Sequence, residues 1–301
     1  MSGSPERGPG GSMTQDLGSV ADSGTSHYVD LPAGRFHYRR WAPDAPAPSA
    51  VLVHGNGGTW ATWARVGAAL GAAGMDVLAV DLRGSGASVR PPAGSYGLRE
   101  VAGDLDDFLH ALRVHAPLLI GHCWGGAAAL ALATGAVADR VPPMLSGLVL
   151  EELPPDMAAT ATQPVVRDFL RMMRSSPEYV AKWVDLVCRD WHPVDRESLL
   201  EELRGADVQV YLSAIDEGAA AGPLLPLLAR VKVPALVLRG DPRRGGMLSD
   251  ADWQLARECL PGHCVAGELP GSGHELHRGD FAGFMRLVRE FLATVAVRGV
   301  R

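Results

Sequence analysis

The chain has 301 residues, of which 47% are hydrophobic and 21% charged, the balance of an ordinary globular protein. Its net charge of −6, from 34 acidic and 28 basic residues, gives no electrostatic reason to expect nucleic acid or an anionic membrane as a partner. No uninterrupted apolar run approaches the roughly 20 residues that a membrane span needs.

Residues 1–26 are rich in Gly and Ser and contain no hydrophobic segment, so we expect a disordered tail rather than a secretory signal. Without a signal, a cytoplasmic location and free thiols are expected for Cys123, Cys188, Cys259 and Cys264. No Cys/His grouping has the short paired spacing of a zinc site. We therefore expect no metal and no organic cofactor.

The first half of the chain alternates between predicted strands and helices. Residues 27–41 predict two short strands around a turn at Pro32-Ala33-Gly34. Apolar strands are then predicted at 50–53, 77–80, 117–120 and 148–150, and helices at 60–73, 98–112 and 125–138. Because these later strands are apolar throughout instead of alternating, they indicate a parallel sheet that is covered on both faces.

The second half begins with helical patterns only, from about residue 154 to 230. Strands are predicted again at 234–238 and 264–269, with helices at 250–259 and 281–295. We therefore predict an α/β core of residues 27–153 and 229–301, interrupted by a helical lid of residues 154–228. The Met and Trp residues of the lid, Met157, Met172, Met173, Trp183 and Trp191, suggest an apolar substrate, although such stripes are more often core.

A strand at 118–120 runs directly into Gly121-His122-Cys123-Trp124-Gly125-Gly126 and then into an Ala-rich helix. This is the pattern G-x-nucleophile-x-G, with cysteine at the nucleophile position and small residues where the turn is tight. The helix N-terminus favours a thiolate, and the amide of Trp124 points toward an oxyanion. We predict that Cys123 is a nucleophile; the alternative is a buried, inert cysteine.

Two further motifs accompany this turn: His54-Gly55-Asn56-Gly57-Gly58 and Asp81-Leu82-Arg83-Gly84-Ser85-Gly86, each after a predicted strand. Together with the turn they resemble the α/β-hydrolase superfamily, over residues 27 to 297. The resemblance implies an α/β-hydrolase fold, with a mostly parallel sheet, helices on both faces and an inserted helical lid. It also implies an oxyanion hole from the amides of Asn56 and Trp124, and a triad in the order nucleophile, acid, histidine.

The histidine of that triad is expected at His274, in Gly271-Ser272-Gly273-His274 after the last strand. A histidine on a Gly-rich loop at a strand end can reach across to the nucleophile. His277 is the rival, but it lies toward the start of a helix, where capping or exposure explains it.

The acid is expected at Asp241, which follows the strand at 235–238, where the superfamily most often places it. However, the loop departs from the usual spacing, and Asp241 before Pro242 also reads as a turn residue. The alternative acid is Glu152, or Glu151, at the end of the preceding strand. The acid would hold the imidazole in the right tautomer and stabilise the imidazolium.

Asn56 and Trp124 look similar to the halide-binding pair of haloalkane dehalogenases, which are related to epoxide hydrolases. Those enzymes form an ester with an aspartate. A cysteine that attacks an alkyl carbon would instead give a thioether, which has no carbonyl to hydrolyse. Cys123 therefore requires an acyl substrate. The hexapeptide also resembles, locally, the cysteine elbows of dienelactone hydrolases and polyhydroxyalkanoate synthases.

We therefore expect a hydrolase or thioesterase that acts on an ester, lactone or thioester through a cysteinyl acyl-enzyme, with Cys123, His274 and Asp241 as the triad. One alternative is an acyltransferase or cyclase that passes the acyl group to an amine, alcohol or thiol. Another is a non-catalytic hydrolase fold that binds a small ligand, which predicts an unreactive Cys123. The expected partner is a small acyl compound, free or carrier-bound; the sequence leaves the oligomeric state open.

Overall fold

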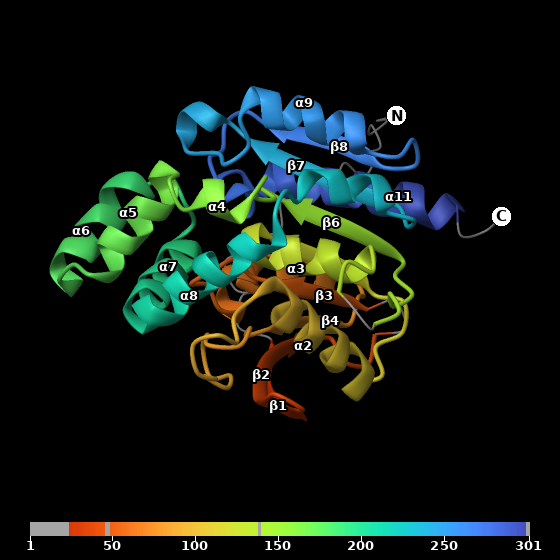
Figure 1. The fold of residues 1–301 in the computed structure, drawn as a ribbon, viewed down its shortest axis with the longest axis horizontal. Helices are drawn as coiled ribbons and strands as arrows, with labels where there is room; N and C mark the ends of the chain where they lie inside the picture. The colour runs from red at the N-terminus through yellow and green to blue at the C-terminus, as the bar shows by residue number, and fades with distance from the viewer. Residues whose placement is uncertain (1–23, 46–48, 138–139, 299–301) are drawn as a thin grey trace, which may run out of the picture.

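The computed structural model describes residues 24–45, 49–137 and 140–298, which form an eight-stranded sheet in the order β1-β2-β4-β3-β5-β6-β7-β8 (Figure 1). The strands are β1 (Thr25–Leu31), β2 (Gly34–Trp41), β3 (Ala50–Val53), β4 (Val77–Val80), β5 (Leu118–His122), β6 (Gly147–Glu151), β7 (Ala235–Gly240) and β8 (Val265–Leu269). β2 pairs antiparallel with both β1 and β4, and the strands from β4 to β8 pair in parallel. The predicted α/β-hydrolase fold class is confirmed.

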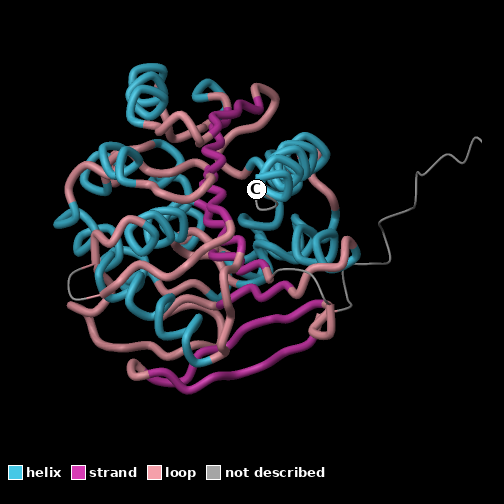
Figure 2. The backbone as a smooth tube through the Cα atoms, turned by 90° about the vertical axis from the view of Figure 1, so that its right-hand side faces the viewer, coloured by secondary structure: helices cyan, strands magenta, loops and turns pink. Residues whose placement is uncertain are grey.

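Helices cover both faces of this sheet (Figure 2). One face carries α2 (Leu98–Ala111), α3 (Cys123–Ala133) and α9 (Asp250–Cys259), whose buried side chains share one apolar cluster with the sheet. The other face carries α1 (Ala64–Ala72) and α11 (Phe281–Arg298), which share a second cluster. Burial on both faces explains why β3 to β7 read as continuous apolar runs.

Between β6 and β7 the chain forms helices only, most of which project beyond the carboxyl end of the sheet (Figure 1), whereas the last one packs against α9. They are α4 (Met157–Thr160), α5 (Pro164–Met173), α6 (Pro177–Val187), α7 (Pro193–Gly205), α8 (Val208–Gly218), η3 (Ala219–Ala221) and η4 (Leu225–Arg230). α5, α6 and α7 enclose a small apolar core of their own, which includes Met172, Val184 and Leu203. We call residues 154–228 the lid.

The expected tail ends earlier than predicted, because Thr25 and Ser26 already belong to β1; residues 1–23 lie outside the described part of the chain. Among the described residues, no helix is long and apolar enough to cross a membrane.

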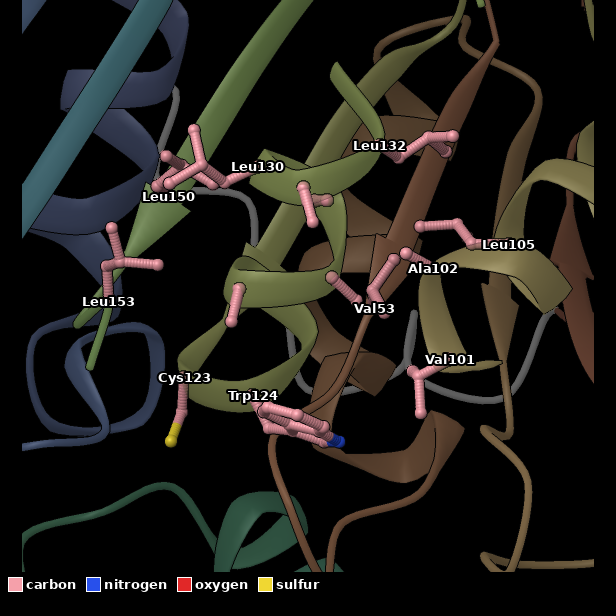
Figure 3. Packing of buried hydrophobic residues seen from close by; sticks show 14 of the residues in the cluster. Val53, Val101, Ala102, Leu105, Cys123, Trp124, Leu130, Leu132, Leu150 and Leu153 are labelled. Atoms are coloured by element: carbon pink, nitrogen blue, oxygen red, sulfur yellow. The ribbon is translucent and has the colours of Figure 1, made fainter. Parts of the chain in front are cut away.

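The turn between β5 and α3 is possible only because three glycines allow the backbone to approach closely. A Cβ on Gly121 would lie 2.6 Å from the Cα of Gly126, and one on Gly125 would lie 2.4 Å from the carbonyl oxygen of His54. Cys123 itself has φ 48°, a left-handed conformation that is costly for a residue with a side chain. Its sulfur points away from the apolar residues packed around α3 (Figure 3).

We expect Gly125→Ala to lower the free energy of unfolding by at least about 1–3 kcal/mol, because the new methyl group meets rigid backbone atoms. Gly205→Ala is the matched control, since a Cβ there meets nothing within 4 Å. It should leave stability unchanged or raise it by about 0.4–1 kcal/mol. Urea unfolding of both variants measures the difference, and equal stabilities would contradict this account of the turn.

Candidate functional site

The chemistry-bearing side chains gather where the parallel strands end, below the lid. Cys123 is the first residue of α3 and is 7% exposed. Asn56 follows β3, Glu152 follows β6, and His274 lies on the loop between β8 and α10 (Leu276–Gly279). Because the carboxyl ends of neighbouring parallel strands meet at one edge, residues far apart in the sequence come together there.

His274 joins Cys123 to a carboxylate. Its imidazole is hydrogen-bonded to the Cys123 side chain, and its Nδ1 lies 3.2 Å from Oε2 of Glu152. Burial disfavours the charged imidazolium, but the attraction of Cys123 and Glu152 outweighs it and raises the pKa of His274 well above its usual value. The arrangement is therefore a thiol, an imidazole and a carboxylate in one chain of hydrogen bonds.

Glu152 is held rigidly in this position. It is fully buried and has φ 50°, and its backbone amide donates to the carbonyl of Leu238 at 2.9 Å. Its Oε1 accepts from the amide of Gly240 at 2.7 Å, and its Oε2 accepts from the amide of Met247. Both carboxylate oxygens thus have backbone donors, and Oε2 also faces His274.

Asp241, the expected acid, does not contact His274. Its carboxylate accepts from the backbone amide of Arg243 at 2.9 Å and pairs with the guanidinium of that residue at 3.1 Å. These hydrogen bonds from Arg243 lower the pKa of Asp241. The prediction that Asp241 orients the histidine is therefore wrong. Asp241 is the turn residue that caps η5 (Pro242–Arg244), and the carboxylate on His274 belongs to the alternative, Glu152.

The two residues expected to form an oxyanion hole, Asn56 and Trp124, flank Cys123. Trp124 stands in the first turn of α3, where backbone amides have no acceptor within the helix. Its side chain is buried (Figure 3), and a Cβ on Gly218 of the lid would lie 2.9 Å from its ring. The side-chain amide of Asn56 donates to the carbonyl of Tyr211 in the lid at 3.0 Å. The Trp124 side chain thus packs against the lid, and the Asn56 side chain binds it. Only the backbone amides of these two residues remain as candidate donors to an oxyanion.

A pocket of about 400 Å³ lies between the lid and the core, and both Cys123 and His274 line it. The lid contributes mainly apolar side chains to its wall, namely Met157, Val165, Val166, Phe169, Trp183, Trp191 and Ile215. Tyr211 also lines it and stacks on Phe169 at 5.2 Å between ring centroids. Burial, and to a smaller extent the nearby Cys123, raise the pKa of the Tyr211 phenol, which therefore stays neutral.

A second His–Glu pair lies behind the first. Nδ1 of His277 lies 2.9 Å from both carboxylate oxygens of Glu151, and Oε1 of Glu151 also accepts from the backbone amide of His277 at 3.1 Å. His277 lies near the start of a helix, as expected, but only 2% of it is exposed, so it is not a surface residue. Nε2 of His122 lies 3.1 Å from the carbonyl oxygen of His274, and burial lowers the pKa of His122 to about 4. This layer holds the histidine loop in place.

Glu275, which follows His274 in the sequence, also lines the pocket. Burial opposes ionisation of Glu275, but the imidazole of His122 and the guanidinium of Arg278 help to lower its pKa to about 2. One nitrogen each of His122 and His274 and one oxygen of Glu275 lie within 4.8 Å of one another. These are the described residues that could hold a metal ion.

Sequence reasoning missed Tyr211, Glu275 and the contacts of His122. Tyr211 carries no motif, and it enters the pocket because the lid folds back over the core. Glu275 directly follows His274, so adjacency to a predicted site residue was the one signal available.

Comparison with known proteins gives both local relatives and whole-fold neighbours. Over 111 residues the chain is 37% identical to bifunctional epoxide hydrolase 2 of Sus scrofa. The matched segment covers 36% of this chain and 20% of the relative. The matched segment is thus about a fifth of that protein.

Two solved structures share the fold at low identity. The enol-lactonase from Burkholderia xenovorans LB400 has a TM-score of 0.71 at 23% identity, over 89% of this chain and 100% of the other. The thioesterase domain from the curacin biosynthetic pathway has a TM-score of 0.67 at 20% identity, over 89% and 99%.

A family model described as the alpha/beta hydrolase fold matches residues 48–240, which include the turn at Cys123, Glu152 and the whole lid. With the sheet order and the site described above, this match shows that the chain belongs to the α/β-hydrolase family.

Proposed function

We propose that this protein hydrolyses an acyl ester, lactone or thioester through a thioester on Cys123, with His274 as the general base and Glu152 as the carboxylate that orients it. The observation that carries the proposal is the chain of contacts from the Cys123 side chain through His274 to Glu152, in the wall of a lidded pocket. The lactone and the thioester in the names of the structural neighbours are the first compounds to test.

In the first half of the reaction, the Cys123 thiolate attacks the carbonyl carbon and forms a C–S bond. The oxyanion that develops would accept hydrogen bonds from the backbone amides of Asn56 and Trp124, and each such donor is typically worth about 10²–10³ in rate. The intermediate collapses as the leaving group departs with the proton held by His274. The product of this half-reaction is a thioester on Cys123 and a free alcohol or thiol.

In the second half, His274 removes a proton from water as the water oxygen attacks the thioester carbonyl. The C–S bond breaks, and the acid product leaves while Cys123 regains its thiolate and His274 keeps the proton. Glu152 keeps the imidazole oriented through both steps, since its hydrogen bond fixes the proton on Nδ1 and leaves Nε2 toward the sulfur.

We expect intact-protein mass spectrometry to detect one acyl group on the wild type after brief exposure to activated acyl thioesters, and none on Cys123→Ala. The control is Cys188→Ala. Cys188 also lines the pocket, but burial raises the pKa of its thiol to about 12, so its loss should not change the labelling.

The adduct should decay in buffer, with release of the free acid. If the adduct persists until an amine or alcohol is added, the reaction is acyl transfer and not hydrolysis. No acylation of the wild type by any donor would support a ligand-binding protein instead.

The variants Glu152→Gln and Asp241→Asn test which of the two carboxylates orients His274. An amide at 152 would direct an N–H group at one of the backbone donors or at His274, so we expect kcat to fall about 10⁴-fold, the loss typical of amidating a triad acid. Asn at 241 still accepts from the amide of Arg243, and an ion pair whose arginine is 87% exposed contributes little, so activity should stay within roughly twofold. Steady-state kinetics on the acyl substrate and melting temperatures test this; a larger loss in Asp241→Asn would contradict it.

A terminal epoxide distinguishes this chemistry from that of the relatives named epoxide hydrolases. The Cys123 thiolate would open the ring, the C–O bond would break, and the oxygen would take up a proton, leaving a thioether without a carbonyl to hydrolyse. We expect a single covalent addition to the wild type, none to Cys123→Ala, and no diol. The diol is measured by chromatography. If it forms continuously, the acyl proposal is ruled out in favour of epoxide hydrolysis.

A further inference from the structure

Three metal-ligating side chains lie together beside the proposed nucleophile. A ring nitrogen of His122, a ring nitrogen of His274 and a carboxylate oxygen of Glu275 are all within 4.8 Å of one another. The three residues line the lid pocket, so a small ion can reach them from solvent by the route that a substrate would take. They come from the end of β5 and from the loop after β8, which is why the sequence has no paired spacing of a zinc site.

Each of the two histidines already has the outer contact that a metal-binding imidazole needs. Nε2 of His122 donates to the carbonyl oxygen of His274, which leaves Nδ1 of His122 with its lone pair. Nδ1 of His274 is hydrogen-bonded to Glu152, which leaves Nε2 on the side of Cys123, and a metal ion there would replace the contact with the Cys123 side chain. A partner on the far nitrogen of the ring fixes the orientation and the tautomer of a metal-binding histidine.

Glu275 supplies an acceptor that the protein itself leaves unsatisfied. Its Oε2 is buried and has no hydrogen-bond partner among the described residues. The nearest opposite charges are Nε2 of His277 at 3.6 Å and Nη1 of Arg278 at 3.5 Å, both beyond a normal hydrogen bond.

The guanidinium of Arg278 is shared between Glu275 and a second carboxylate. Its Nη2 binds both carboxylate oxygens of Glu202, at 2.9 and 3.0 Å. Oε2 of Glu275 thus has two cationic neighbours but no hydrogen bond, and a bound cation would supply the direct contact that the protein does not.

We propose that His122, His274 and Glu275 form a binding site for Zn²⁺, with the fourth coordination position open to the pocket beside Cys123. Two imidazoles and one carboxylate are a donor set of zinc sites that keep an open position, whereas Mg²⁺ and Ca²⁺ prefer oxygen ligands. A zinc ion on His274 would occupy the lone pair that the reaction needs, so Zn²⁺ would inhibit the enzyme reversibly. This consequence alone rests on the proposed function.

Binding is measured on metal-free protein by competition between the protein and a chromophoric zinc chelator, with no substrate present. We expect one zinc ion per chain for the wild type. Glu275→Gln should bind at least about tenfold more weakly, since even outer-shell partners of a ligand are worth roughly 10–100-fold in metal affinity. Glu258→Gln, the same change at an exposed position on α9, is the matched control and should bind like the wild type.

Two more variants distinguish loss of the zinc site from loss of the proposed reaction. His122→Asn should weaken zinc binding by a similar factor, with His110→Asn, at an exposed histidine, as its control. Cys123→Ala should retain the zinc site although it abolishes acylation, because sulfur is not among the three ligands. Excess Mg²⁺ should not compete. The proposal is overturned if Glu275→Gln and His122→Asn bind zinc as tightly as the wild type, or if only Cys123→Ala loses the ion.

Discussion

The tight turn from β5 into α3 is the constraint on which the rest of the site depends. Cys123 keeps a left-handed backbone at φ 48° because Gly121, Gly125 and Gly126 let the strand, the helix and the end of β3 approach to backbone contact. This conformation lifts the sulfur out of the apolar layer and places it at the N-terminus of α3, where free amides and the helix dipole favour an anion. A side chain at Gly121 or Gly125 would meet backbone atoms at 2.4–2.6 Å, so the turn could not keep this geometry.

Two adjacent glutamates at the end of β6 divide the support of the site between them. Glu151, the last residue of β6, faces His277, and Glu152, the first residue after the strand, faces His274. The positive φ of Glu152 marks the point where the chain leaves the strand and turns into the lid. Each carboxylate is buried, and a buried charge without partners would destabilise the fold. Each of the two, however, has an imidazole and at least one backbone amide as partners. The reactive pair and the supporting pair therefore stabilise the same loop.

The lid is attached to the core through polar contacts that also shape the pocket. Asn56 binds the carbonyl of Tyr211, Arg65 pairs with Asp195 at 2.6 Å, and the hydroxyl of Thr62 donates to Glu202 at 2.7 Å. Glu202 also binds Arg278, in α10 of the core. The pocket wall thus combines apolar side chains of the lid with charged side chains, which are Asp168, Asp190, Glu202, Arg244 and Glu275.

The sequence by itself determined the fold class, the helical nature of the lid and the positions of Cys123 and His274, because these depend on local patterns: apolar strands, helical periodicity and glycines at fixed offsets from the turn. It did not determine which carboxylate meets His274. Asp241 and Glu152 both follow strands, and only the path of the loop after β7, which turns Asp241 toward Arg243, separates them. The entry of Tyr211 into the pocket and the grouping of His122 with Glu275 were likewise decided by tertiary structure, since they join segments that share no local signal and meet only when the lid and the sheet pack together.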